Sequence, residues 1–190
     1  MKIRESGMPS EEMWEKFFDI PLIFSKLRLN DSINDVAEFG SGYGTFTIPA
    51  SKIIKGTLFA YDIDESMIKN LNKKVKENNI ENIKVIQADF VNDGTKLNKE
   101  AVDYTMLFNI LHAEEPFLLL NEACRILKPG GKAGVIHWIY SDETPRGPSL
   151  DIRPTKEQCI NWMKEAGFEI KDSPVFLPPY HYGIIGYKNK

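Results

Sequence analysis

Short apolar runs alternate with amphipathic stretches along this chain, and the alternation restricts the possible folds more than any other feature. Apolar runs predict strands over residues 35–40, 56–62, 83–89, 102–108, 132–138, 168–176 and 182–188. Helical spacing predicts helices after Gly44 and over residues 65–78, 116–127 and 155–166. Strands that are separated by helices need crossover connections, so they form a mostly parallel sheet with helices on both faces.

The two ends of the chain depart from this alternation. Only residues 177–181 separate the last two predicted strands, which is too short for a helix, so these strands should pair antiparallel. Met13, Trp14, Phe17 and Phe18 form an apolar stripe at helical spacing before the first strand. We expect one domain over residues 1–190, with residues 1–30 as a helical extension and possible lid, and residues 31–190 as the core.

Composition excludes several classes of function. The 190 residues are 42% hydrophobic and 27% charged, with a net charge of -3, so a basic surface for nucleic acid or anionic membranes is not expected. Cys124 and Cys159 lie in helical patterns and are interpreted as small buried side chains, with no disulfide or metal site expected. No apolar run approaches the ~18 residues of a membrane span, and no signal peptide is visible. We therefore expect a cytoplasmic protein; its oligomeric state is not predicted.

Three glycines, Gly40, Gly42 and Gly44, follow the first predicted strand directly and open a helix. In open α/β sheets, ligands bind at the carboxyl ends of the strands. Glycine permits unusual backbone torsions and lets a ligand approach the N–H groups, and a helix N-terminus adds partial positive charge. The loop predicts a site for a polar or anionic ligand. The alternative is a tight strand-to-helix turn without a ligand.

Acidic residues end the next two predicted strands. Asp62 is placed to accept hydrogen bonds from the two hydroxyls of a ribose, whereas Asp64 suits the N-cap of the following helix. Asp89 ends the third strand, where its carboxylate can accept from an adenine amino group with Phe90 beside the ring. Together with the glycine loop, these acids outline an adenosine site. The alternative for Asp62 is a cap or turn acid.

The glycine spacing differs from that of dinucleotide-binding loops. The third glycine of G-x-G-x-x-G comes one position early here, and Thr45 stands where that fingerprint has glycine. Glu38, just before the loop, would repel a pyrophosphate but suits an α-amino group. The expected ligand is therefore an adenosine that carries an amino acid and no phosphates.

Four motifs in this order resemble the class I S-adenosylmethionine-dependent methyltransferases: "EFGSGYG", "YDIDESMI", "QADF" and "ACRILKPGGKAGV". The resemblance runs from about Val36 to the C-terminus. It implies an α/β fold, a Rossmann-like three-layer sandwich. Its sheet would be seven-stranded and mostly parallel, in the order 3-2-1-4-5-7-6, with strand 7 antiparallel.

The resemblance also implies a cofactor and its contacts. S-adenosyl-L-methionine would be the methyl donor and S-adenosyl-L-homocysteine the product. Glu38 and the glycine loop would hold the methionyl part, Asp62 the ribose and Asp89 the adenine, while Asn109 would flank donor and acceptor. The residues expected to bind the cofactor are Glu38, Gly40, Ser41, Gly42, Tyr43, Gly44, Asp62, Ile63, Asp89, Phe90 and Asn109.

The acceptor is less constrained by the sequence. Residues 109–112 read "NILH" where nucleic-acid methyltransferases of this type carry Asn/Asp-Pro-Pro-aromatic, so a small-molecule acceptor is expected, and no nucleic acid. His112 and His137 follow or end strands on the acceptor side and are candidate general bases; the alternative is that both are packed side chains. The extension and the loop over residues 140–154 are free to shape the acceptor pocket.

Two features leave alternatives open. Arg146 and Arg153 in the 140–154 loop could clamp an anionic substrate or be salt-bridged. A methyltransferase is the first hypothesis for the whole chain. The second is a non-catalytic S-adenosylmethionine-binding module or partner subunit, and the third is an NAD-dependent oxidoreductase, against which the glycine spacing and Glu38 count.

Overall fold

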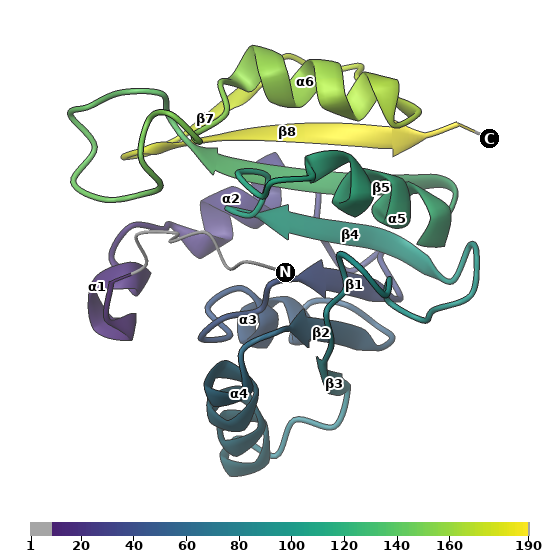
Figure 1. The fold of residues 1–190 in the computed structure, drawn as a ribbon. Coiled ribbons are helices and arrows are strands. Elements are labelled where there is room, and N and C mark those ends of the chain that lie inside the picture. The colour runs from purple at the N-terminus through teal and green to yellow at the C-terminus, as the bar shows by residue number, and fades with distance from the viewer. Residues whose placement is uncertain (1–8, 190) are drawn as a thin grey trace.

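Strands and helices alternate along residues 9–189, the part of the chain that this computed structural model describes (Figure 1). The strands are β1 (Val36–Phe39), β2 (Leu58–Asp62), β3 (Ile83–Gln87), β4 (Val102–Phe108), β5 (Leu127–Trp138), β6 (Phe168–Glu169), β7 (Val175–Leu177) and β8 (His181–Lys188). The helices are α1 (Glu11–Glu15), α2 (Ile20–Lys26), α3 (Thr47–Ser51), α4 (Glu65–Glu77), α5 (Pro116–Ile126) and α6 (Lys156–Glu165). The four helices predicted by spacing correspond to α3, α4, α5 and α6.

The strands form one sheet in the order β3-β2-β1-β4-β5-β8-β6, and β7 also pairs with β8. β1 to β5 run parallel to one another, whereas β8 is antiparallel to β5, β6 and β7. The predicted Rossmann-like order is therefore confirmed, with β8 in the place of the antiparallel strand. The predicted antiparallel pairing across residues 177–181 is also confirmed, because Leu177 is the ladder partner of His181.

The predicted strand over residues 168–176 differs from the structure. It is divided into β6 and β7, which pair with opposite ends of β8. Pro174 in the interruption has no N–H to give to the ladder. Asp172 is also engaged elsewhere, since it accepts hydrogen bonds from Arg28 and from the Tyr187 hydroxyl at 2.8 Å. The described sheet thus has eight strands where seven were expected.

Two apolar clusters pack on opposite faces of the sheet and make the three layers. One joins α2, α3 and α4 to the sheet through residues such as Ile23, Ala50 and Leu71. The other joins α5 and α6 to the sheet through residues such as Leu119 and Met163. Because α2 belongs to a core layer, a covering role for the N-terminal segment is restricted to the residues before it.

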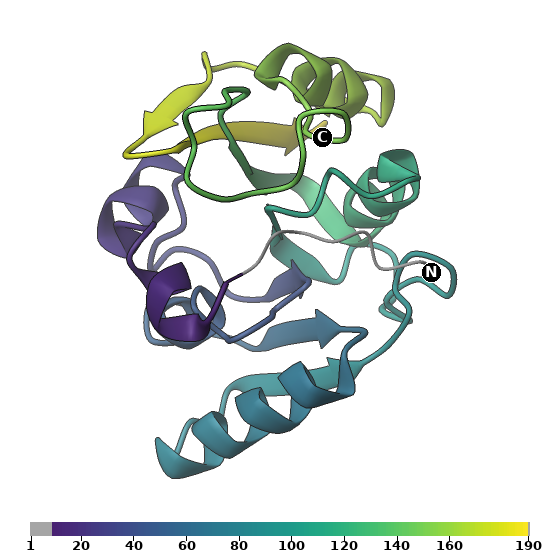
Figure 2. The same ribbon diagram turned by 60° about the vertical axis from the view of Figure 1, so that its left-hand side comes forward.

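The carboxyl ends of the parallel strands share one edge of the sheet, and β8 begins at this same edge, where His181 pairs with Trp138. Both α1 and the long loop after β5 lie at this edge, which Figure 2 brings forward. Every site residue predicted from the sequence lies on β1, β2, β4 or β5 or in a segment that follows a strand. Within residues 9–189, none of the helices combines the length and the apolarity of a bilayer-spanning helix.

Candidate functional site

The glycine loop has a backbone that other residues would strain. Gly40, Gly42 and Gly44 have φ angles of 78°, 50° and 80°. A Cβ at Gly40 would lie 2.8 Å from the Ile110 side chain, and one at Gly44 would lie 2.6 Å from Leu71. The loop is therefore closely packed against the segment after β4 on one side and against α4 on the other.

Hydrogen bonds fix this loop to the end of β2. The backbone N–H groups of Gly40 and Ser41 both donate to the Tyr61 carbonyl, at 2.9 and 2.8 Å. The helix after the loop begins only at Thr47, so Pro49 occupies its first turn, where an N–H has no intrahelical partner to lose. The backbone of the loop is thus held open at the carboxyl edge of the sheet.

Asp62 joins the glycine loop to the start of the next helix. Its Oδ2 accepts from the Gly42 N–H at 2.7 Å, and its Oδ1 accepts from the Asp64 N–H at 2.9 Å. Burial raises the pKa of Asp62, although these two N–H groups oppose the shift. Asp64 caps α4 by accepting from the Ser66 N–H at 2.7 Å, as predicted.

Glu38 is buried at the end of β1, with 2% of its surface exposed. Its Oε2 accepts from the Thr47 hydroxyl at 2.5 Å. Burial raises its pKa to about 8, against the effect of the Thr47 hydrogen bond, and the nearby charge of Asp62 raises it further. No ion pair to Glu38 forms within residues 9–189, so the carboxyl group is mostly protonated near pH 7.

The two residues predicted on the adenine side have different surroundings. Asp89 is half-buried and accepts from the backbone and side chain of Asn92, at 3.2 and 2.8 Å. The Phe90 ring is 2% exposed and packs against Phe39 and Tyr61, with ring centroids 5.6 and 6.5 Å apart. That ring belongs to the core, so the group that Phe90 offers at the strand end is its backbone.

Polar side-chain atoms near the loop lack partners. Asn109 has a φ angle of 55°, and its backbone N–H donates to the Ile136 carbonyl at 2.8 Å. Its side-chain Oδ1 and Nδ2, like the Ser41 Oγ, are buried without a hydrogen-bond partner in the described structure. Together with the buried carboxyl of Glu38, these atoms fit a ligand that brings a cationic amino group and further polar atoms.

The two candidate general bases lie beside each other, which the sequence did not predict. His137 Nε2 is 3.4 Å from His112 Nδ1. Burial lowers the pKa of His137 well below its ordinary value, and His112 and His181 lower it further. His181 was not singled out in the sequence. It is fully buried between Trp138 and Phe18, with ring centroids 4.3 and 4.6 Å away.

Within residues 9–189, Arg153 forms no ion pair. Its guanidinium is buried and donates to the carbonyl oxygens of Ile139, Ser141 and Pro148, at 2.6 to 3.0 Å. It also donates to the Thr144 hydroxyl at 2.6 Å. Arg153 therefore stabilises the loop after β5 from inside. Arg146, the other arginine of this loop, is exposed.

The N-terminal segment contacts the glycine loop as well as β5. The Tyr43 hydroxyl donates to the Pro9 carbonyl at 3.0 Å. Lys74 of α4 donates to the Tyr43 carbonyl at 2.7 Å and pairs with Glu11 of α1. Trp14 packs on Trp138, with ring centroids 6.3 Å apart. Residues 1–8 of the predicted extension lie outside the described residues.

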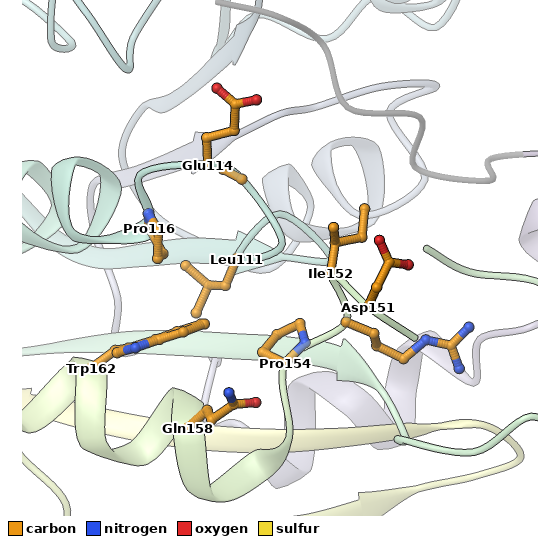
Figure 3. Close-up of a pocket in the computed structure, with 10 residues that line it drawn as sticks. Leu111, Glu114, Pro116, Asp151, Ile152, Pro154, Gln158 and Trp162 are labelled. Carbon is orange, nitrogen blue, oxygen red and sulfur yellow. The ribbon is translucent and has the colours of Figure 1, made fainter. Parts of the chain in front are cut away.

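A cavity of about 210 Å³ lies between the segment after β4 and α6 (Figure 3). Leu111, Pro154 and Trp162 form apolar walls, while Glu114 and Asp151 lie at its border. None of its lining residues belongs to the glycine loop. The sequence contained no signal for this cavity, because its walls come from three separate segments.

Comparisons with known proteins identify the family. Residues 36–131 match the model of a methyltransferase domain. The chain is 32% identical to a ribosomal protein L11 methyltransferase of Exiguobacterium sibiricum over 81% of this chain, and 31% identical to a ubiquinone/menaquinone biosynthesis C-methyltransferase of Rickettsia peacockii over 85% of it. It spans 42% of the first relative's length and 72% of the second's.

A solved structure agrees in fold. The crystal structure of a SAM-dependent methyltransferase from Aquifex aeolicus superposes with a TM-score of 0.83 at 23% identity, over 94% of this chain and 93% of the other. Together with this fold, the family model and the two relatives show that the chain belongs to the family of S-adenosylmethionine-dependent methyltransferases, enzymes whose cofactor is S-adenosylmethionine.

Proposed function

We propose that this protein transfers the methyl group of S-adenosylmethionine to a small-molecule acceptor at the carboxyl edge of the sheet. The observation that carries the cofactor part of the proposal is Glu38, a buried carboxyl group without a cation beside it in the described structure. The α-amino group of the cofactor supplies such a cation. Glu38 would hold that group, while Asp62 accepts from the ribose hydroxyls and Asp89 from the adenine amino group.

When bound, the cofactor supplies an activated methyl group on a sulfonium, so the protein mainly has to align the two reactants. Alignment of this kind is worth about 10⁵ M or more in effective concentration. Ser41 and Asn109 hold unpartnered polar atoms beside the loop and would orient the methionyl part. A general base is required only if the acceptor keeps a proton at neutral pH.

His112 would be that base, with His137 as the residue that positions it. The two rings share a close contact of 3.4 Å, and His137 is fully buried. Since burial keeps the pKa of His137 well below its ordinary value, that ring stays neutral at pH 7 and can hold the His112 ring without competing for its proton. For an acceptor that keeps its proton, we expect His112→Gln to slow methyl transfer by about 10²-fold. The affinity of the protein for S-adenosylhomocysteine should not change.

The proposal that the acceptor is a small molecule rests on how the acceptor side of the site is covered. α1 packs over the end of β5, and both Trp14 and Phe17 are more than nine-tenths buried there. A closed site of this kind suits a ligand that is enclosed completely. The named relatives include a methyltransferase for a ribosomal protein and one in quinone biosynthesis, so family membership does not decide between protein and small-molecule acceptors.

The test is incubation with methyl-labelled S-adenosylmethionine and two acceptor pools, a small-metabolite extract and the denatured proteins of the same cells. We expect label in the small-molecule fraction and formation of S-adenosylhomocysteine. Label in protein alone would contradict the small-molecule acceptor. Tight S-adenosylhomocysteine binding with no label in either pool would favour a binding module. Glu38→Gln serves as the binding-deficient control.

A further inference from the structure

Six ring-bearing side chains gather where α1 meets the ends of β5 and β8, and we call them the aromatic box. They are Trp14, Phe17, Phe18, Trp138, Tyr180 and His181. Trp138 and His181 are ladder partners. Phe17 contacts Trp138 edge-on at 5.3 Å between centroids, and Phe18 lies 4.6 Å from His181. The box thus joins the N-terminal segment to the sheet.

Three nitrogen atoms inside the aromatic box have no hydrogen-bond partner in the described structure. They are Nε1 of Trp138 and both ring nitrogens of His181. Both side chains are fully buried, so no partner is available from bulk water. A buried polar atom without a partner costs free energy, and an apolar ring would avoid that cost at this position. The nitrogens therefore indicate a polar ligand that the box receives.

The aromatic box also borders the cofactor site. Tyr43 of the glycine loop packs against it. In contrast, the cavity near α6 has no lining residue from that loop. α1, which closes the box, has five residues and no side-chain cap, and a helix of that length is not stable by itself. A ligand could therefore enter by displacing α1 and its Trp14, while the sheet and Phe17, which follows α1 and contacts Trp138, stay in place.

We propose that the aromatic box is the acceptor site and that it takes a flat aromatic compound carrying a hydroxyl group. This inference rests on the proposed function and names its substrate class. The aromatic walls select a flat apolar ring, which can stack on Trp138 or lie edge-on to Phe17.

A hydroxyl group matches the hydrogen-bonding capacity of the nitrogens. The Trp138 N–H can only donate. Burial lowers the pKa of His181 to about 3, and the charge of Arg153 lowers it further, so this imidazole is neutral and offers one donor and one acceptor. A hydroxyl group both donates and accepts. A carbonyl or halogen cannot donate, and an ammonium group cannot accept.

The test compares two probes of nearly equal size, 2-naphthol and 2-fluoronaphthalene, on the protein saturated with S-adenosylhomocysteine. Calorimetry should show 2-naphthol binding at least about tenfold more tightly, because a site that hydrogen-bonds a hydroxyl discriminates against an analogue without one. His181→Phe keeps the ring and removes the nitrogens, so the difference between probes should fall to about threefold or less. Trp138→Phe is the second variant and should act in the same direction.

Two further variants distinguish the contribution of the aromatic walls to probe binding from a general effect of removing a phenylalanine ring. Phe17→Ala should weaken the binding of both probes equally. Phe176→Ala, at an exposed ring of β7, should change the binding of neither probe. The inference is overturned if 2-naphthol does not bind, or if folded His181→Phe and Trp138→Phe proteins keep the full difference. Binding of S-adenosylhomocysteine to the same samples tests the proposed function separately, because its loss would contradict the cofactor site and not the aromatic box.

Discussion

At the scale of single residues, Glu38 connects protonation to cofactor binding. With a pKa of about 8, it is mostly protonated at pH 7, and a cationic amino group favours its carboxylate form. S-adenosylhomocysteine binding at pH 7 should therefore release close to one proton. Calorimetry in two buffers with different ionisation enthalpies measures this number, and Glu38→Gln should abolish the release. If Glu38→Gln releases as many protons on binding as the unmodified protein, Glu38 does not have this role.

The same raised pKa affects folding in the absence of ligand. The unfolded chain loses the Glu38 proton near pH 4.5, while the folded protein keeps it until about pH 8. The folded state therefore binds more protons between these values, and Glu38 lowers the free energy of unfolding as the pH rises from about 4.5 to 8. Ligand binding should offset this loss above neutral pH.

Asp62 and Asp64 provide a matched pair of substitutions. Asp62→Ala removes a carboxylate that holds the Gly42 N–H, so S-adenosylhomocysteine binding should weaken by about 10- to 100-fold, as for a charged hydrogen bond worth roughly 1.5–3 kcal/mol. Asp64→Ala removes the cap of α4 and should lower stability by about 1 kcal/mol with little effect on binding. Calorimetry and thermal melting separate the two. The reverse order would mean that Asp64 is the ribose ligand.

At the scale of elements, the glycine loop can be compared with Gly130, a glycine of similar backbone geometry near the irregular start of β5. Gly42 and Gly130 have φ angles of 50° and 77°, and a Cβ at Gly130 would meet no atom within 4 Å. Valine at either position should cost about 1–2 kcal/mol from the left-handed backbone alone. Only Gly42→Val should also abolish the thermal shift produced by S-adenosylhomocysteine. If Gly42→Val keeps this thermal shift, the loop is only a strand-to-helix turn and does not bind the cofactor.

α1 should respond to the cofactor because it is connected to the glycine loop through Tyr43 and Lys74. We expect amide hydrogen exchange over residues 11–18 to slow when S-adenosylhomocysteine binds. Exchange in α6, which packs against α5, β6 and β8, is the internal reference and should stay unchanged. If α1 exchanges equally with and without ligand, it is a structural helix and does not act as a cover of the cofactor site.

At the scale of the whole molecule, the cofactor should act as a stabilising ligand of the folded state. S-adenosylhomocysteine at 100 times its Kd should add about 2.7 kcal/mol, which for a chain of this size raises Tm by roughly 5–10 °C. NAD at the same concentration should leave Tm unchanged, because the loop lacks the dinucleotide spacing and NAD carries no α-amino group for Glu38 to hold. A larger shift with NAD would contradict the cofactor assignment.

Features with a local cause were predictable from the sequence. Parallel strands follow from the alternation of apolar runs and helices, and the loop at Gly40, Gly42 and Gly44 follows from the torsions that glycine permits. The cap at Asp64 is likewise a local pattern. These features depend on neighbours within a few residues, so an unaligned sequence carries them.

Features that depend on distant segments were not predictable. The orientation of the Phe90 ring toward Phe39 and Tyr61 depends on packing between three strands. The contact of His112 with His137, and the burial of His181 under Phe18, join residues far apart in the sequence. The interruption between β6 and β7 depends partly on Asp172 meeting Arg28.

The way Arg153 holds the loop after β5 has a consequence for which of the loop's residues are free to vary. The path of the loop is set by hydrogen bonds from one internal side chain to backbone carbonyls, which every residue type possesses. Asp142, Glu143 and Arg146 point to solvent and take no part in them through their side chains. Mutations at these positions can therefore accumulate without altering the frame that presents them. These three positions are therefore the ones at which a randomised library would leave the path of the loop unchanged.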